Sequence, residues 1–282
     1  CVDRGIMKGS TDGYFYPENN VTHAQFFAIS VRLIKENNLL PAPIIKTDGS
    51  SFPEKGSEDY IKLEEILGKQ LFNVLTKINS GTYGGTDILS KLDEIYSLIS
   101  SSSSASVSLR MAAEGARYRY IFKVLDSKDM SADEKYGVLK SYFGISEGHH
   151  PWADEYVFDW FKYMFFFTPA YNSKYYRFVS GLDANVARGF VFAAVDEMLL
   201  SSIGSYACDT AEEYFTDVEK GYRGISTNLR RSGIVTGYED KTLRLSNSIR
   251  RGEMAAIIHR VLNYIDEQRG SAGEPTNAQT AD

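Results

Sequence analysis

The clearest pattern along the chain is a glycine-rich turn segment followed by an apolar stripe with helical spacing. Residues 5–25 contain an Asp-Gly pair and a proline, which favour a compact loop, and a helix-like stripe begins directly after them. The same order of loop and stripe recurs near the other end of the chain. The two stripes are Phe26, Ile29, Leu33 and Ile34, and Met254, Ile257, Val261 and Leu262. The pattern predicts a loop followed by an amphipathic helix at both places.

These two places are copies of one repeat. Residues 5–32 align with residues 233–260 without a gap. The positions that are identical in both copies are Gly5 and Gly233, Ile6 and Ile234, Gly9 and Gly237, Asp12 and Asp240, Asn19 and Asn247, Ala28 and Ala256, Ile29 and Ile257, and Arg32 and Arg260. Because identity without gaps across a turn-rich segment is hard to obtain from composition alone, we infer an internal repeat.

Capping signals mark the start of the helix in both copies. Thr22 with Gln25 has the spacing of a capping box, and Val21 with Phe26 has that of a hydrophobic staple. The matching positions of the last copy are Ile249 and Met254 for the staple, Arg250 in place of the capping hydroxyl, and Glu253 for the acceptor of the box. Both copies therefore predict a defined helix start after the loop.

A third, more diverged copy lies between these two, and a further helix precedes the loop of each later copy. Val186 and Val191 take the staple positions of the middle copy, and Arg188 takes its first helical position. Apolar residues with helical spacing predict the preceding helices. They are Trp152, Val157, Trp160, Phe161 and Met164 before the middle loop, and Tyr222, Ile225 and Leu229 before the last loop. The complete unit is therefore helix, glycine-rich loop, helix.

The first copy is the exception, because almost nothing precedes Gly5. We expect the chain, which begins with Cys1, to be a processed or excised product whose first repeat lacks its first helix. The apolar stripe of Phe26, Ile29 and Leu33 then needs another cover. We expect a helix from the insertion described next, from an upstream peptide or from a neighbouring chain to supply it.

Residues 37–146 do not follow the repeat and predict a helical insertion with a linker. Helical spacing indicates one stripe made of Leu63, Ile66, Leu67, Leu71, Val74, Leu75 and Ile78, and a second made of Ile88, Leu92, Ile95 and Ile99. A serine run at residues 100–104 separates them from a further helix. Pro41, Pro43 and Pro53 indicate an extended entry. Packing of these helices on themselves or on a neighbour is the interpretation that the pattern favours.

The last copy resembles an S-layer homology repeat. That family's unit begins Phe-x-Asp-Val, continues into Gly-Ile-x-x-Gly and an Asp-Gly-x-Phe-x-Pro loop, and restarts at Ile-Thr-Arg-Ala-Glu. The positions that match in the last copy are Phe215, Asp217, Val218, Gly233, Ile234, Gly237, Asp240, Ile249, Arg251 and Glu253. The loop of the first copy matches through Asp12, Gly13, Phe15 and Pro17. Together the three copies cover somewhat over half of the chain.

The resemblance implies a fold and a function. Three such repeats would pack as a three-pronged pseudo-trimer and bind secondary cell-wall polymers, often pyruvylated, which hold surface proteins on the cell wall. In the family the arginine of the Thr-Arg-Ala-Glu segment is the main ligand contact, and its position carries over to Arg188, Arg251 and His23. The first turn of a helix favours an anion, and an arginine adds bidentate recognition. His23 would be mostly neutral at pH 7, so its site should be weaker or lost.

The repeats depart from the family motif in ways that leave alternatives open. Threonine is kept only as Thr22 and glutamate only as Glu253, while Phe190 takes the acidic position of the middle copy. Capping is the preferred interpretation of Thr22 and Glu253. For Arg188 and Arg251, ligand binding and a solvated surface charge are equally good interpretations.

Composition and charge exclude several function classes. The formal net charge is −6 and no cluster of Lys and Arg occurs, which argues against a nucleic-acid partner. No apolar run is long enough to cross a bilayer. The only cysteines, Cys1 and Cys208, form no metal-ligand cluster and no disulfide framework. The adjacent His149 and His150 lack a third ligand nearby in the sequence, so neither a metal nor a cofactor is expected.

Acidic pairs are the only signal for an enzyme. Asp154 with Glu155 and Glu212 with Glu213 could in principle serve glycoside hydrolysis, which needs two carboxylates. A solvated helix face is a far more ordinary explanation of such pairs. We therefore expect no catalytic activity and place a wall-active hydrolase last among the alternatives.

The sequence thus predicts an all-α chain with three repeats in a pseudo-trimeric arrangement and a helical insertion. The expected boundaries are 1–36 for the incomplete first repeat, 37–146 for the insertion, 147–204 for the second repeat, 205–269 for the third and 270–282 for a flexible tail. The expected function is extracellular anchoring on anionic cell-wall polysaccharide. The expected binding residues are Arg188, Arg251, His23, Glu253, Asp12 and Asp240. The alternative is a surface-layer or filament component that uses its repeats for self-association or for contact with other surface proteins.

Overall fold

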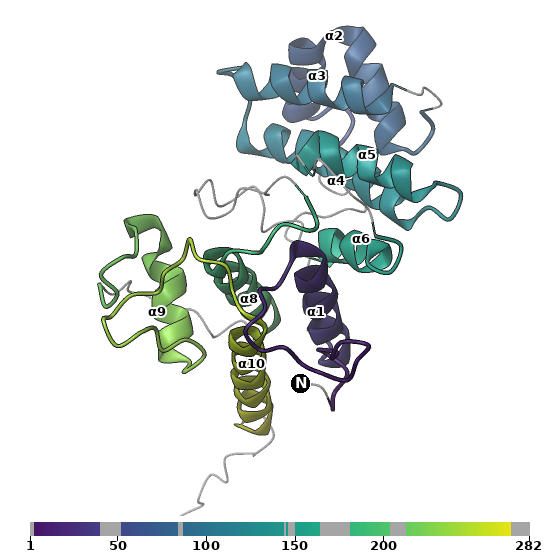
Figure 1. Ribbon diagram of the computed structural model, residues 1–282. Coiled ribbons are helices and arrows are strands. Elements are labelled where there is room, and N and C mark those ends of the chain that lie inside the picture. The colour runs from purple at the N-terminus through teal and green to yellow at the C-terminus, as the bar shows by residue number, and fades with distance from the viewer. Residues whose placement is uncertain are drawn as a thin grey trace, which may run out of the picture. The chain divides into compact units, whose positions relative to one another are not determined.

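The computed structural model describes residues 3–39, 52–83, 87–143, 145, 150–163, 181–203 and 213–271. Within these ranges every regular element is a helix and no strand occurs, so the all-α prediction is confirmed (Figure 1). Several sequence-based expectations lie outside the described residues, namely those on Cys1, Pro41, Pro43, His149, Met164, Cys208, Glu212 and residues 272–282.

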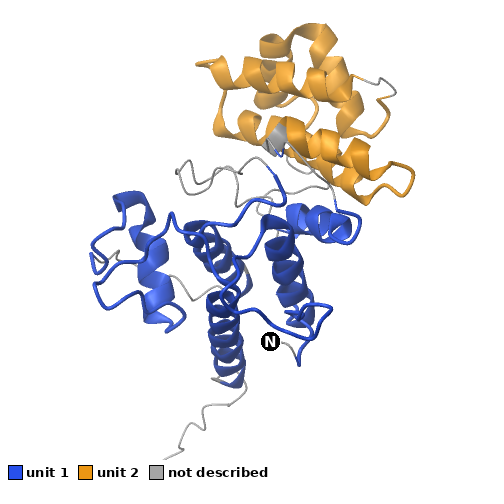
Figure 2. Cartoon of the chain, in the orientation of Figure 1, with its two compact units in different colours: residues 1–42, 144–282 blue, residues 43–143 orange. Residues whose placement is uncertain are grey.

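The chain forms two compact units, which Figure 2 shows in different colours. Unit 1 consists of Cys1–Ala42 and Gly144–Asp282 and contains all of the sequence that was predicted to form repeats. Unit 2 is Pro43–Phe143 and contains residues that do not follow the repeat.

The described residues of unit 2 form a bundle of four helices, α2 (Glu58–Asn79), α3 (Ile88–Ser101), α4 (Val107–Asp126) and α5 (Ala132–Phe143). The predicted stripe of α2 is confirmed, since all seven of its residues lie in or pack against one buried core, but the helix is not continuous, because Gly68 has φ 68° and ψ 160° and breaks it. Glycine adopts this conformation at no steric cost, which a stripe of apolar spacing cannot reveal. The α3 stripe is confirmed, since Leu92, Ile95 and Ile99 are buried.

Unit 1 contains the second helix of each repeat, α1 (His23–Glu36), α8 (Arg188–Ile203) and α10 (Arg251–Ser271). It also contains α6 (Asp154–Tyr163), the short 3₁₀ turn η1 (Lys220–Tyr222) and α9 (Arg223–Arg231). Residues of α1, α6, α8 and α10 together enclose the centre of the core, among them Leu33, Trp160, Met198 and Ile257. Helix α10 runs through Ser271 and so extends past Gly270, where the expected tail begins.

The capping box predicted for α1 is confirmed. The Thr22 hydroxyl accepts the Gln25 backbone N–H, and the Gln25 side chain accepts the Thr22 backbone N–H, both at 3.3 Å. The staple residues Val21 and Phe26 are buried. In the last repeat the Glu253 carboxylate likewise accepts the Arg250 backbone N–H at 3.0 Å, so half of the box remains although the capping hydroxyl is absent.

The apolar stripe of α1 is covered by α6. Phe26, Ile29 and Leu33 are at most 4% exposed, and Trp160 of α6 lies 4.7 Å from the Phe27 ring between centroids. The expectation that a helix covers this stripe is confirmed, but the sources named for it, the insertion, an upstream peptide or another chain, are wrong. The helix that does so is the one which precedes the loop of the middle repeat.

The same pairing recurs one repeat later, since within the described residues α9 packs mainly against α8, the second helix of the middle repeat. The Tyr222 hydroxyl fixes this contact by donating to the Gly189 carbonyl at 2.6 Å. The assignment of Trp152 to the α6 stripe is wrong, because Trp152 is 54% exposed and precedes the helix. It lies in a turn closed by the Ala153 N–H and the His150 carbonyl.

The three helix starts are joined in a closed ring of backbone hydrogen bonds. Val21 donates to Ile249, Ile249 donates to Val186, and Val186 donates to Val21, at 2.9–3.0 Å. All three side chains are fully buried. The flanking residues form three isolated antiparallel bridges, Asn20 with Arg250, Thr22 with Asn185, and Ala187 with Ser248. Each repeat therefore pairs with both others, and this fixes where the loops lie.

Candidate functional site

His23, Arg188 and Arg251, at the motif position that was expected to contact a ligand, are the first residues of α1, α8 and α10. They occupy equivalent positions beside the ring of backbone hydrogen bonds. The backbone N–H groups of His23, Arg188 and Arg251 donate to carbonyls of the neighbouring repeats at 2.8–3.0 Å. The next N–H of each helix does the same. Since these donors already have partners, the positive helix ends are directed into the ring and not toward solvent.

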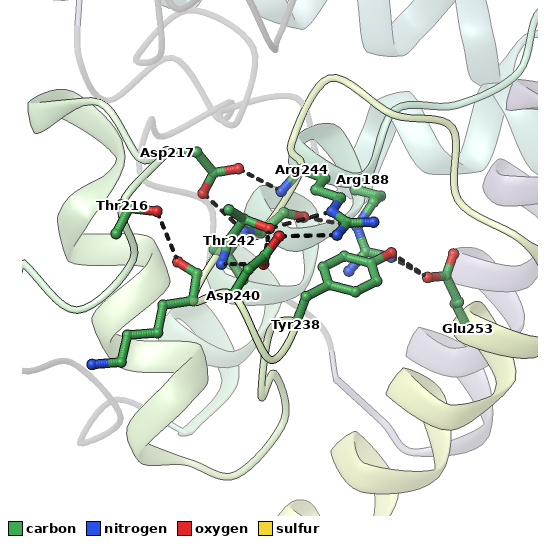
Figure 3. A network of polar contacts seen from close by, with 10 residues as sticks. Arg188, Thr216, Asp217, Tyr238, Asp240, Thr242, Arg244 and Glu253 are labelled. Atoms are coloured by element: carbon green, nitrogen blue, oxygen red, sulfur yellow. Dashed lines mark hydrogen bonds and ion pairs between the residues drawn. The ribbon is translucent and has the colours of Figure 1, made fainter.

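Arg188 is buried between the middle and last repeats, with 6% of its surface exposed. Its Nε donates to the Leu243 carbonyl at 2.9 Å, and an Nη donates to Glu253 at 2.5 Å. The guanidinium also lies over the rings of Phe192 and Tyr238, 5.1 Å from each centroid. The solvated-charge interpretation is therefore wrong for Arg188, which links two repeats. Figure 3 shows this group beside the last loop.

Arg251 makes the equivalent link between the last and first repeats. Its Nε donates to the Phe15 carbonyl at 2.9 Å, and an Nη donates to the Lys8 carbonyl at 2.7 Å. Phe15 and Leu243 are equivalent loop positions, so both arginines reach the same point of the loop that faces them. Burial lowers the pKa of Arg251, but a guanidinium starts from so high a value that it remains charged.

His23 occupies the third position and is 4% exposed. Its Nδ1 lies 2.9 Å from the Ala184 carbonyl, so the neutral ring carries its proton there. The Phe27 and Phe190 rings flank the imidazole. Burial lowers the pKa of His23, while the hydrogen bond to Ala184 opposes the shift. This downward shift of the His23 pKa agrees with the expectation of a neutral imidazole at pH 7.

This burial makes the stability of unit 1 depend on pH. In the unfolded chain His23 has an ordinary pKa of about 6.5. As the pH falls, the unfolded chain therefore binds a proton at His23 at a higher pH than the folded chain does. The folded protein, with its lowered pKa, therefore loses stability below that pH. We expect urea unfolding at pH 7 and pH 5.5 to show a larger loss for the wild type than for His23→Gln. Equal losses in the two proteins would contradict the burial of a neutral ring.

Glu253 has contacts in the middle repeat as well as in its own repeat. Besides capping α10, its carboxylate accepts hydrogen bonds from Arg188 and from the Tyr238 hydroxyl, the latter at 3.0 Å. Burial opposes its charge, but the Arg250 N–H and the Arg188 guanidinium outweigh this and lower the pKa of Glu253. The carboxylate is therefore ionised at neutral pH.

Asp12 and Asp240 shape the loops of the first and last repeats. Each accepts the backbone N–H two residues further on, at 3.0 Å from Tyr14 and 3.1 Å from Thr242, which is an Asx turn. Each also binds the side chain four residues further on, a hydroxyl in the first loop and Arg244 in the last. All six expected binding residues thus have contacts that build the fold, and contact with a ligand remains a prediction for each.

Sequence analysis gave no role to several residues that form the last loop. Asp217 accepts the backbone N–H groups of Leu243 and Arg244 at 2.8 and 2.7 Å, as Figure 3 shows. Phe215 packs so closely on Gly237 that a Cβ there would lie 2.4 Å from its ring. The family motif contains both of these side chains, and that was the only signal for them.

A polar groove of about 860 Å³ lies between the first and last repeats. Its lining consists of Pro17, Glu18, Asn20, Tyr238, Arg244, Ser246, Asn247, Ser248, Arg250, Gly252, Glu253 and Ala256. A cavity of about 170 Å³ that includes Arg188 adjoins it and shares Tyr238 and Glu253. The exposed cations of the groove are Arg244 and Arg250, whose side chains are 44% and 58% exposed.

Among the described residues, no three His, Cys, Asp or Glu side chains are grouped so that they could hold a metal ion. His150 pairs instead with Asp183 at 2.8 Å. A search of the same residues for helices that are long and apolar enough to cross a membrane found none.

Comparison with known sequences identifies part of this arrangement. The family model described as the S-layer homology domain matches residues 1–27 and 214–255. These ranges contain the loop and helix start of the first repeat, and the first helix, loop and helix start of the last. No curated protein and no solved structure matches the chain. Domains of this family anchor proteins to cell-wall polymers at the cell surface.

Proposed function

Parts of the first and last repeats match the S-layer homology family model, and from this premise we propose that the chain is a non-catalytic anchoring module for anionic, pyruvylated cell-wall polysaccharide. The observation that carries the proposal is the polar groove between these same two repeats. Its walls are formed by residues 17–20 of the first repeat and by residues between 238 and 256 of the last. The two matched stretches of sequence therefore face each other across one groove.

The lining of the groove fits a charged sugar chain. Asparagine and serine side chains offer hydrogen bonds to hydroxyl groups, and the Tyr238 ring positions a cation of the groove. Arg244 stacks on that ring with its guanidinium 3.9 Å from the centroid. A planar guanidinium can bind a ketal carboxylate through two parallel hydrogen bonds.

The present partners of the groove arginines are easily exchanged. Arg250 pairs with Glu18 at 2.6 Å and Arg244 with Asp240 at 3.0 Å, and all four side chains are at least 44% exposed. Exposed ion pairs of this kind contribute little stability. A carboxylate of the polymer could therefore replace either partner at small cost.

Arg188 and Arg251 have a different role in this proposal. They hold the loops that form the groove walls, because each donates to a loop carbonyl of the repeat that faces it. Arg188 also lines the adjoining cavity beside Tyr238 and Glu253. In this proposal Arg244 and Arg250 contact the polymer. Arg188 and Arg251, which the sequence suggested as ligand contacts, act mainly as positioning residues.

Co-sedimentation with purified cell-wall sacculi tests the proposal. We expect the wild-type chain to pellet and Arg244→Ala/Arg250→Ala to lose about tenfold in apparent affinity, since two charge-assisted contacts disappear. Arg4→Ala is the matched control, because Arg4 is 51% exposed and its ion pair with Asp266 lies outside the groove lining. Equal pelleting of all three proteins would place the binding site elsewhere.

Failure of the wild-type chain to pellet would favour the alternative, in which the repeats serve protein–protein assembly in a surface layer. Sedimentation velocity then distinguishes the cases, since self-association is expected only under the assembly alternative. A wall-active hydrolase would instead release soluble wall fragments, and a substitution of its carboxylates would abolish that release.

A further inference from the structure

The two exposed arginines of the groove in unit 1 are held in different ways. Arg244 is fixed within its own loop, where it donates to Thr242 at 3.3 Å and to Asp240 at 3.0 Å (Figure 3). Arg250 is held from the opposite wall, because its guanidinium donates to the Glu18 carboxylate at 2.6 Å. Among the described residues no other side chain bonds to that guanidinium. The position of the Arg250 side chain therefore depends on Glu18.

The carboxylates of these two ion pairs differ in what they contribute to the fold. Asp240 also accepts the backbone N–H of Thr242 at 3.1 Å and its hydroxyl at 2.6 Å, so the last loop depends on this carboxylate. Glu18 makes no second hydrogen bond within the described part of the chain, and its side chain is 78% exposed. The pair with Arg250 therefore contributes little to the stability of the first loop.

Comparison of the repeats shows that the loop needs no carboxylate at the position of Glu18. The alignment of the first and last repeats places Ser246 there in the last repeat. Both loops nevertheless close in the same way. The next residue, Asn19 or Asn247, donates its backbone N–H to the carbonyl three residues before it, at 3.1 Å in the first loop and 3.0 Å in the last. Since serine supports the same turn, the charge of Glu18 is not required for it.

An anion that enters the groove must displace Glu18 before it can bind Arg250. The displaced carboxylate remains attached to the groove wall, so its negative charge stays close to the anion and repels it. Both side chains of the pair are more than half exposed, and solvent therefore weakens the attraction as well as the repulsion. The competition is expected to lower the affinity by a small factor and not to prevent binding.

We propose that Glu18 is a specificity-determining residue of the groove, which competes with the carboxylates of the polymer for Arg250. The inference rests on the proposed function, because it concerns the same groove. Glu18 lowers the affinity for an anionic polymer and leaves the affinity for a neutral one unchanged. It thereby reduces the preference of the groove for a charged chain.

Isothermal titration of the full chain with purified wall polysaccharide, before and after mild acid removes its ketal carboxylates, tests the proposal. Glu18→Gln should bind the native polymer about two- to fivefold more tightly than the wild type, as expected when one exposed competing carboxylate is removed. Its affinity for the treated polymer should not change, which separates competition from an altered groove shape. Glu36→Gln is the matched control and should leave both affinities unchanged, because Glu36 is exposed at the last residue of α1 and outside the groove lining.

An Arg250→Ala background shows whether Glu18 acts through this arginine. Most of the gain from Glu18→Gln should disappear there, since the group for which Glu18 competes is absent. If the wild type binds the native polymer and Glu18→Gln binds it no more tightly, this inference alone is overturned. It is also overturned if the treated polymer gains as much as the native one, if Glu36→Gln brings the same gain, or if the full gain persists without Arg250. If the wild type does not bind the native polymer at all, the proposed function fails and this inference fails with it.

Discussion

Replacing Trp160 by alanine is expected to lower the free energy of unfolding of unit 1 by about 3–5 kcal/mol. The side chain is fully buried and packs against Phe26, Phe27, Phe161 and Phe190, with ring centroids 4.7–6.2 Å apart. Its removal leaves a cavity between α6 and α1 where the ring contacts are lost. Differential scanning calorimetry of the variant and the wild type measures the effect.

Trp152 supplies the control, because the chain has only these two tryptophans and both lie in unit 1. Trp152 is 54% exposed, so Trp152→Ala should change stability by no more than about 1 kcal/mol. If the two variants were equally stable, α6 would not be the cover of the α1 stripe.

Arg188→Met is expected to destabilise unit 1 by about 3 kcal/mol. Methionine fills much of the same volume but removes the side-chain donor to the Leu243 carbonyl and one of the three donors to the Glu253 carboxylate, and it breaks a charge-assisted link between two repeats. Urea unfolding followed by tryptophan fluorescence reports on unit 1 alone, since Trp152 and Trp160 are both there.

Arg4→Met is the matched substitution, since the Arg4 pair with Asp266 is exposed on both sides and should contribute less than about 1 kcal/mol. A role of Arg188 confined to ligand contact predicts that Arg188→Met and Arg4→Met are equally stable. That result would contradict the link between the middle and last repeats.

Local patterns predicted the helix starts well because their causes are local. The Thr22 capping box and the Val21 staple depend on residues within one turn of each other, and both are present. Repeat alignment also located Arg188 and Arg251 at the first helical positions correctly. Each of these features is decided by neighbours in the sequence.

Such local patterns could not predict which residues distant in the sequence would contact each other. An apolar stripe shows that Phe26 and Leu33 must be buried, but not that α6 buries them. In the same way, nothing near Arg188 indicates that a loop carbonyl of the next repeat will meet its guanidinium. The burial of that charge follows only from the ring that joins the three repeats.

Backbone conformation limited the prediction in other places. The break at Gly68 needs one residue in a left-handed conformation, which leaves the spacing of apolar residues intact. Tyr16 and Arg244 have φ of 50° and 51° at equivalent loop positions, although neither residue type signals it. That conformation brings both side chains back onto the loop aspartates, and in the last loop it places Arg244 at the groove.

The most direct measurement of the central claim is isothermal titration of the full chain with purified wall polysaccharide, before and after mild acid removes its ketal carboxylates. The account predicts saturable binding of the native polymer and a loss of at least about tenfold after the treatment, because the anionic groups that Arg244 and Arg250 recognise are gone. Equal affinity for both polymers, or no binding of the native one, would contradict it.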